Sequence, residues 1–153
     1  MEKLWKIATD EQYKTEEEYQ KNRPEKVLEY YGEALENDME KMLEYEIVSD
    51  ITSIDSFPIY LKSDFYIKIP KNKIANGYNI KVFETMYQSD KLYPCKLHSL
   101  LTENRYDCSN KEDLTNKIED ELKNERFKEK ISYLLRHFYN KEELEKLIKD
   151  SGD

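Results

Sequence analysis

Residues 59–69 read IYLKSDFYIKI, and residues 78–82 read YNIKV. In both stretches apolar side chains alternate with polar ones, which is the pattern of a β-strand with one buried face. Ser63 and Asp64 fit a turn that divides the first stretch into two short strands. Pro70 ends the second of these, because proline cannot donate to a strand ladder. The middle of the chain therefore predicts an antiparallel sheet.

Two features extend this sheet into a meander of three or four strands. Asn76 and Gly77 provide the positive φ of a tight turn before residues 78–82. A further strand is expected at about residues 92–97, where Pro94 favours an edge position. Connections this short join antiparallel neighbours.

A long amphipathic helix is expected before the sheet. Pro24 fits its first turn, where the N–H that proline lacks has no partner in any case. Apolar residues then recur at three- and four-residue steps over about five turns: Val27, Leu28, Tyr31, Ala34, Leu35, Met39, Met42 and Leu43. Gly32 lies within this helix, where glycine costs about 1 kcal/mol relative to alanine. Two capping boxes predict a shorter helix at about residues 10–22.

Helices are also expected after the sheet. Ser109 and Glu112 match a capping box, and the apolar positions that follow recur at four-residue steps. The apolar stripe changes phase near residues 124–126, which indicates a kink or two abutting helices. Asn140 and Glu143 then restart a last short helix.

Together these elements predict an α+β fold, as a single domain over residues 1–153. Its parts are an acidic helical part at residues 1–48, a basic antiparallel sheet at residues 57–98 and C-terminal helices at residues 109–149. The net charge is −9 in residues 1–58, +4 in residues 59–97 and −3 in residues 98–153. We expect the helices to cover one face of the sheet and to leave the other face open.

Composition narrows the class of protein. Apolar and charged residues each make up 38% of the chain, which permits a core and argues against disorder. No apolar run approaches the roughly 20 residues of a membrane span, and the residues after Met1 do not resemble a signal peptide. We therefore expect a cytoplasmic protein that does not act at a membrane. Lysine, asparagine, isoleucine and tyrosine, which use A/T-rich codons, are abundant and point to a low-GC bacterium, its phage or a mobile element.

Motifs for catalysis are scarce. The chain has three glycines, too few for a glycine-rich phosphate loop, and it has no GxSxG or HExxH motif. Cys95 and Cys108 are expected as free thiols in a reducing compartment, with a disulfide between them as the alternative. Cys95 and His98 are three residues apart and would point to opposite faces of a strand. An enzyme that uses these three residues is therefore the least favoured hypothesis, and no cofactor or metal is expected.

Acidic residues of the long helix are the leading candidates for function. Six of them lie mostly opposite the apolar stripe: Glu25, Glu29, Glu33, Glu36, Glu40 and Glu44. Rows of carboxylates on a rigid helix approximate a line of phosphates, so they can compete for basic protein grooves. The leading hypothesis is a non-enzymatic inhibitor that binds a protein with a basic surface, with nucleic-acid-handling proteins as one class. The alternative explanation is a plain solvated helix face.

The open face of the sheet is the second candidate. It would carry Tyr60, Lys62, Tyr66, Lys68 and Lys81. Aromatic rings interleaved with lysines can stack bases and neutralise phosphates, so the alternative hypothesis is a nucleotide- or nucleic-acid-binding module. The plainer explanation is that tyrosine favours strands and that lysine protects exposed strands from pairing with other chains.

Overall fold

The computed structural model describes residues 19–53, 59–70 and 77–151 of the 153-residue chain. Its elements, in chain order, are α2 (Pro24–Asp38), β1 (Glu44–Ser53), β2 (Tyr60–Ile69), β3 (Tyr78–Gln88), β4 (Cys95–Ser99), β5 (Arg105–Cys108), α3 (Lys111–Lys123), α4 (Glu125–Phe138) and α5 (Lys141–Ser151). The helix expected at residues 10–22 lies mostly outside the described residues, of which 19–22 are helical. Asn76 also lies outside them.

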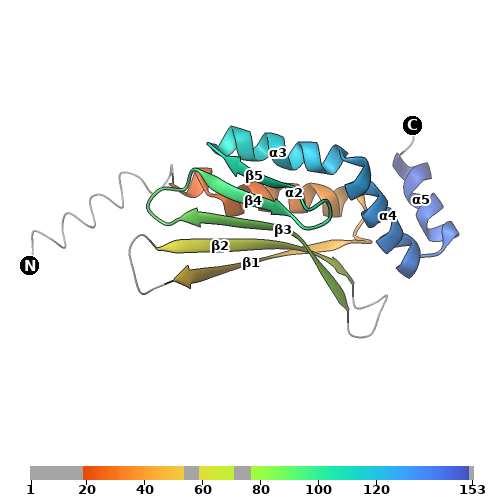
Figure 1. Cartoon of the computed structure of the whole chain (residues 1–153). Helices are drawn as coiled ribbons and strands as arrows, with labels where there is room; N and C mark the ends of the chain where they lie inside the picture. The colour runs from red at the N-terminus through yellow and green to blue at the C-terminus, as the bar shows by residue number, and fades with distance from the viewer. Residues whose placement is uncertain (1–18, 54–58, 71–76, 152–153) are drawn as a thin grey trace, which may run out of the picture.

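The five strands form one antiparallel sheet in the order β1-β2-β3-β4-β5 (Figure 1). The expected α+β class and meander are therefore confirmed. The expected count of three or four strands was too low, because β1 and β5 were not predicted. β1 begins at Glu44, inside the part expected to be helical, and β5 lies beyond residue 98, where the sheet was expected to end.

β2 is one continuous strand, so the turn expected at Ser63 and Asp64 is wrong. Both residues have partners within the sheet that hold them in an extended conformation. The Ser63 hydroxyl contacts the hydroxyls of Ser49 and Tyr87 on the face that the helices cover. The Asp64 carboxylate lies 3.3 Å from Lys81 Nζ on the other face.

β4 begins at Cys95, so Pro94 precedes the strand instead of lying within it. The expected edge position is also wrong, because β4 pairs with β3 on one side and with β5 on the other. Proline at this place removes no ladder hydrogen bond, and it therefore carries no information about whether the strand is central.

The helices lie on one side of the sheet, where α2 and α3 run side by side (Figure 1). Alternate residues of the strands point toward them, as the fully buried Phe65, Ile67 and Ile69 of β2 show. Leu28 of α2 and Ile118 of α3 are buried against this face. The other face of the sheet, which we call the open face, has no helix over it in the described part of the chain.

α2 ends at Asp38, earlier than the apolar stripe up to Leu43 indicates. Glu40 and Lys41 adopt left-handed conformations, with φ of 48° and 65°, and so reverse the chain. Leu43 is nevertheless fully buried, which explains why its spacing fits a longer helix. The chain then enters β1 at Glu44.

Gly32 allows α2 to pack closely on β1. A Cβ atom at this position would lie 2.4 Å from Cδ2 of the Tyr45 ring, a distance that no real contact allows. Glycine in the middle of the helix is therefore explained by this close approach, and not by a need for a special backbone conformation.

Asparagine side chains begin the C-terminal helices. Asn110 accepts a hydrogen bond from the N–H of Asp113 at the start of α3, one residue after the expected cap at Ser109. Asn124 separates α3 from α4, so the phase change marks two abutting helices, one of the two expected outcomes. Asn140 and Glu143 form the expected reciprocal capping box at the start of α5.

Candidate functional site

The six glutamates expected on one helix are divided among three elements. Glu25, Glu29, Glu33 and Glu36 lie on α2, whereas Glu40 lies in the turn after it and Glu44 begins β1. A single helical row of six carboxylates is therefore wrong. Because β1 contacts α2 after the turn, the acidic residues continue from the helix onto the edge strand of the sheet.

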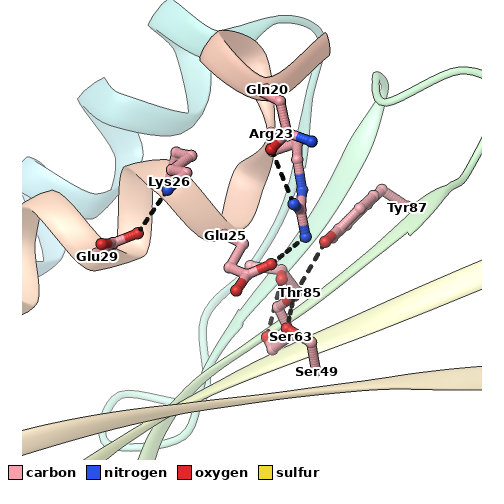
Figure 2. A network of polar contacts seen from close by, with 9 residues as sticks. All are labelled: Gln20, Arg23, Glu25, Lys26, Glu29, Ser49, Ser63, Thr85 and Tyr87. Atoms are coloured by element: carbon pink, nitrogen blue, oxygen red, sulfur yellow. Dashed lines mark hydrogen bonds and ion pairs between the residues drawn. The ribbon is translucent and has the colours of Figure 1, made fainter. Parts of the chain in front are cut away.

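At the start of α2, two of these glutamates have basic partners (Figure 2). Glu25 forms an ion pair with the guanidinium of Arg23, which also donates to Gln20 Oε1 at 3.1 Å. Glu29 Oε2 lies 3.2 Å from Lys26 Nζ, one helical turn away. Their charges are therefore matched locally, and the net negative charge of α2 comes from its later turns.

A polar cluster lies under the start of α2 and joins three strands (Figure 2). The Ser63 hydroxyl on β2 lies 2.8 Å from the Ser49 hydroxyl on β1 and 3.0 Å from the Tyr87 hydroxyl on β3. Thr85 donates to the Ser63 carbonyl at 2.8 Å. Burial raises the pKa of Tyr87 above its ordinary value. These groups satisfy one another, so the cluster fixes the strands.

Negative charge gathers around Tyr45 at the later turns of α2. The Tyr45 backbone N–H donates to Glu36 Oε1 at 3.2 Å. Burial raises the pKa of Tyr45, and the charges of Glu33, Glu29 and Glu36 raise it further. The negative potential is therefore strong where α2 meets β1.

Carboxylates of β1 extend this potential. Residues 44, 46 and 50 of β1 lie on the open face of the sheet, since Tyr45 between them faces α2. Residues 19–53 contain nine acidic and four basic side chains. We call the following set the acidic edge: Glu33, Glu36, Glu40, Glu44, Glu46 and Asp50.

The five residues of the second candidate site lie on the open face of the sheet, as expected. They come from β2 and β3: Tyr60, Lys62, Tyr66, Lys68 and Lys81. Two carboxylates lie among the lysines. Lys81 Nζ is 3.3 Å from Asp64 and 3.1 Å from Glu84. Lys62 Nζ is 3.6 Å and 3.7 Å from the same two carboxylates.

These ion pairs neutralise Lys62 and Lys81 at the centre of the open face. The hydrogen bond with Glu84 raises the pKa of Lys81. Burial by itself raises the pKa of Glu84, but the hydrogen bond with Lys81 and the charges of Lys62, Lys81 and His98 outweigh it and lower that pKa. Asp64 is 7% exposed, and its Oδ1 has no hydrogen-bond partner within the described part of the chain. The centre of the open face is therefore a matched charge network.

A shallow hollow of about 280 Å³ lies over β3, β4 and β5. Its basic lining residues are Lys62, Lys96, His98 and Arg105, and its acidic ones are Glu84 and Asp107. Of these, only Lys62 belongs to the expected set. Lys96 lies on the strand expected at residues 92–97, but Arg105 could not be placed beside it from the sequence, because β5 was not predicted and four residues are too few for a strand pattern.

Cys95, His98 and Cys108 do not form a site together. Cys95 and Cys108 face each other across β4 and β5, buried on the side of the helices, and both are free thiols as expected. Burial raises the pKa of Cys95, and it raises that of Cys108 to about 11. His98 lies on the opposite face, 3.7 Å from Glu84. The thiols therefore lack the nearby base that an activated nucleophile needs.

The chain matches no family model, and no curated protein or solved structure is significantly similar to it. No helix within the described ranges is long and apolar enough to cross a membrane. In those same ranges, no group of three His, Cys, Asp or Glu side chains is placed to hold a metal ion. The function must therefore be argued from charge and geometry.

Proposed function

We propose that this chain is a non-enzymatic protein of the cytoplasm that binds a protein partner with a basic surface and inhibits it. The observation that carries the proposal is the acidic edge, where carboxylates of α2, the following turn and β1 gather with few basic side chains among them. Complementary charge of this kind steers a partner toward its site and rejects partners of the wrong sign.

A nucleic-acid-handling protein is the partner class that this charge fits best. The carboxylates of α2 recur every three or four residues, so they form a row along one side of the helix that can compete for a groove built to hold phosphates. The sharp turn at Glu40 and Lys41 then redirects the row along β1. The proposed inhibitor occupies the groove where the partner binds nucleic acid.

The test is affinity capture with a charge-reversed variant. Glu33, Glu40 and Glu44 become lysine in one variant, and the exposed Glu112, Asp120 and Glu129 of α3 and α4 become lysine in a control with the same net charge. Both are incubated with nuclease-treated lysate of a low-GC bacterium. A stoichiometric partner retained by the wild type and the control, but lost with the first variant, is the expected result. A partner retained equally by both variants would contradict the proposal.

The hollow on the open face favours a second candidate, a nucleotide- or nucleic-acid-binding module. Lys96 and Arg105 line it without an ion pair in the described residues, in contrast to Lys62. The test is binding of a fluorescent single-stranded oligonucleotide over a range of salt concentrations. Binding that weakens steeply with salt, and that is lost when both residues become alanine, is expected from this candidate. Absent or salt-independent binding would remove it.

A further inference from the structure

β1 is a long edge strand with an unpaired side. It has ten residues, and within the described part of the chain it pairs only with β2. The strand at the other edge, β5, has four residues. Natural sheets protect long edges with charged side chains, proline or bulges; β1 has no lysine or proline, its charged residues are acidic, and its ladder is irregular only after Ile51. Val48 and Ile51 are 37% and 55% exposed, so apolar groups accompany the free backbone.

The free backbone groups of β1 can be assigned to particular residues. The Tyr45 N–H donates to Glu36 Oε1, so it points away from β2. Backbone groups alternate in direction along an antiparallel strand, which places those of Ile47, Ser49 and Ile51 on the same free side. The short contact between the Ser49 and Ser63 hydroxyls, 2.8 Å, is typical of a pair that exchanges no ladder bonds. The unpaired stretch therefore begins after Tyr45.

Charge determines which strand can pair with this edge. The open-face residues of β1 include Glu44, Glu46 and Asp50, and the strand has no basic residue. A neighbouring strand places its side chains directly opposite these, where unlike charges stabilise and like charges destabilise the pair. Alternating lysine or arginine on the incoming strand therefore matches β1.

A second copy of this chain is a poor match. An antiparallel pair of β1 strands centred on Val48 sets Glu46 against Asp50 of the second copy, and a pair centred on Ile47 sets Glu44 against Asp50. Both registers bring like charges together twice by symmetry. The acidic residues thus permit a basic strand and disfavour self-pairing in these two registers.

We propose that β1 binds an extended basic segment of a partner protein as a sixth, antiparallel strand of the sheet. Backbone groups of Ile47, Ser49 and Ile51 supply the hydrogen bonds, and carboxylates of the acidic edge select basic side chains. This inference takes from the proposed function only the expectation that the partner is basic. It adds a mode of binding that charge alone does not require.

The test uses a fluorescent peptide of alternating lysine and valine, and its binding is followed by anisotropy. Ser49→Pro removes the outward N–H and places a ring in the path of the incoming strand, but it removes no bond of the β1–β2 ladder. Ser49→Ala is the matched control, because it also loses the hydroxyl contact with Ser63 but keeps the N–H. We expect Ser49→Pro to weaken binding by about tenfold or more, and Ser49→Ala by less than about twofold.

Amide hydrogen exchange of the wild type gives a second readout that needs no variant. The peptide is expected to slow exchange at Ile47, Ser49 and Ile51. The amides of Val48 and Asp50 point toward β2 and serve as the internal control, because their protection exists before the peptide binds. Slower exchange at the first three alone supports an added strand, and unchanged exchange at a saturating peptide concentration overturns it.

The remaining outcomes separate this inference from the proposed function. If Ser49→Pro binds the peptide as well as the wild type, and Glu46→Lys with Asp50→Lys abolishes binding, strand addition is wrong and the acidic edge stands. Equal binding of a glutamate–valine peptide would overturn the selection by charge. A dimer of the chain alone that Ser49→Pro dissociates would show that the occupant is a second copy, which also overturns the inference.

Discussion

The acidic edge and the centre of the open face both carry carboxylates, but at the centre of the open face lysines lie among them. On the open face, Lys62 and Lys81 each lie within 4 Å of two carboxylates, those of Asp64 and Glu84. At the acidic edge, carboxylates follow one another along α2 and β1, and Lys68 is the basic residue that reaches Glu46, at 3.6 Å. The difference teaches that local pairing, and not the net charge of a segment, decides which surface has charge left for a partner.

The largest effect is expected from breaking the contact that holds α2 on β1. Gly32→Val places a branched side chain against the Tyr45 ring and should lower the free energy of unfolding by about 2–3 kcal/mol. Asn37→Val, on the exposed side of α2, is the control and should change it by less than about 0.5 kcal/mol. Urea denaturation of both variants measures this difference. An equal loss in the two would mean that the close packing is not what requires glycine.

The next effect separates the two regions by their ion pairs. Lys81→Met leaves Asp64 and Glu84 without their nearest cation, and Asp64 is nearly buried, so a loss of about 1–2 kcal/mol in unfolding free energy is expected. Lys26→Met on α2 removes an exposed pair with Glu29 and should cost less than about 0.5 kcal/mol. Thermal unfolding compares the two. A larger loss of unfolding free energy for Lys26→Met than for Lys81→Met would contradict the conclusion that the ion pairs of the open face are the stronger ones.

Acid should weaken the sheet through carboxylates whose pKa is lowered. The pKa of Glu84 is lowered mainly by Lys81, against burial, and that of Glu121 by hydrogen bonds from Tyr106, Asn104 and Thr102, also against burial. Because each folded-state pKa lies below the unfolded value of about 4.3, this stabilisation is present above that pH and is lost as the pH falls through the folded value. Denaturation between about pH 6 and pH 3 measures the loss. Glu121→Gln should make the unfolding free energy less dependent on pH. An unchanged pH dependence would contradict the role given to Glu121.

The smallest effect concerns the ion pair that links the two regions. Lys68→Ala frees Glu46, which should change the unfolding free energy by less than about 0.5 kcal/mol and tighten binding of the lysine–valine peptide by about twofold. Lys96→Ala removes a lysine of the open face with no ion pair in the described residues and is the control. Anisotropy titrations of both variants measure the difference. Equal tightening by the two would show that only net charge matters.

Much of the fold was predictable where one local pattern dominates. Alternation in β2 and β3 gave the sheet, and the side chains of Asn140 and Glu143 gave the start of α5. β1 was not predicted, because the buried Leu43 continues the helical spacing of α2. Tyr45, Ile47 and Ile51 do alternate with polar residues, as a strand requires.

The site was less predictable, because its properties depend on contacts between distant residues. Nothing near Asp64 in the sequence shows that Lys81 neutralises it, and so Asp64 looked like a turn residue. Glu36 was expected to face solvent, whereas it accepts the Tyr45 N–H and covers one end of the free edge. The sign of the charge was readable from composition, but which charges are matched required the register of the strands.

The most direct measurement compares two variants in the same affinity capture from nuclease-treated lysate. Glu33, Glu40 and Glu44 become lysine in one variant, and Lys96 and Arg105 become alanine in the other. The predicted result is a protein partner that the wild type and the Lys96 and Arg105 variant retain and that the glutamate variant loses. Loss of the partner with the Lys96 and Arg105 variant alone would contradict the account and place the binding surface on the open face of the sheet.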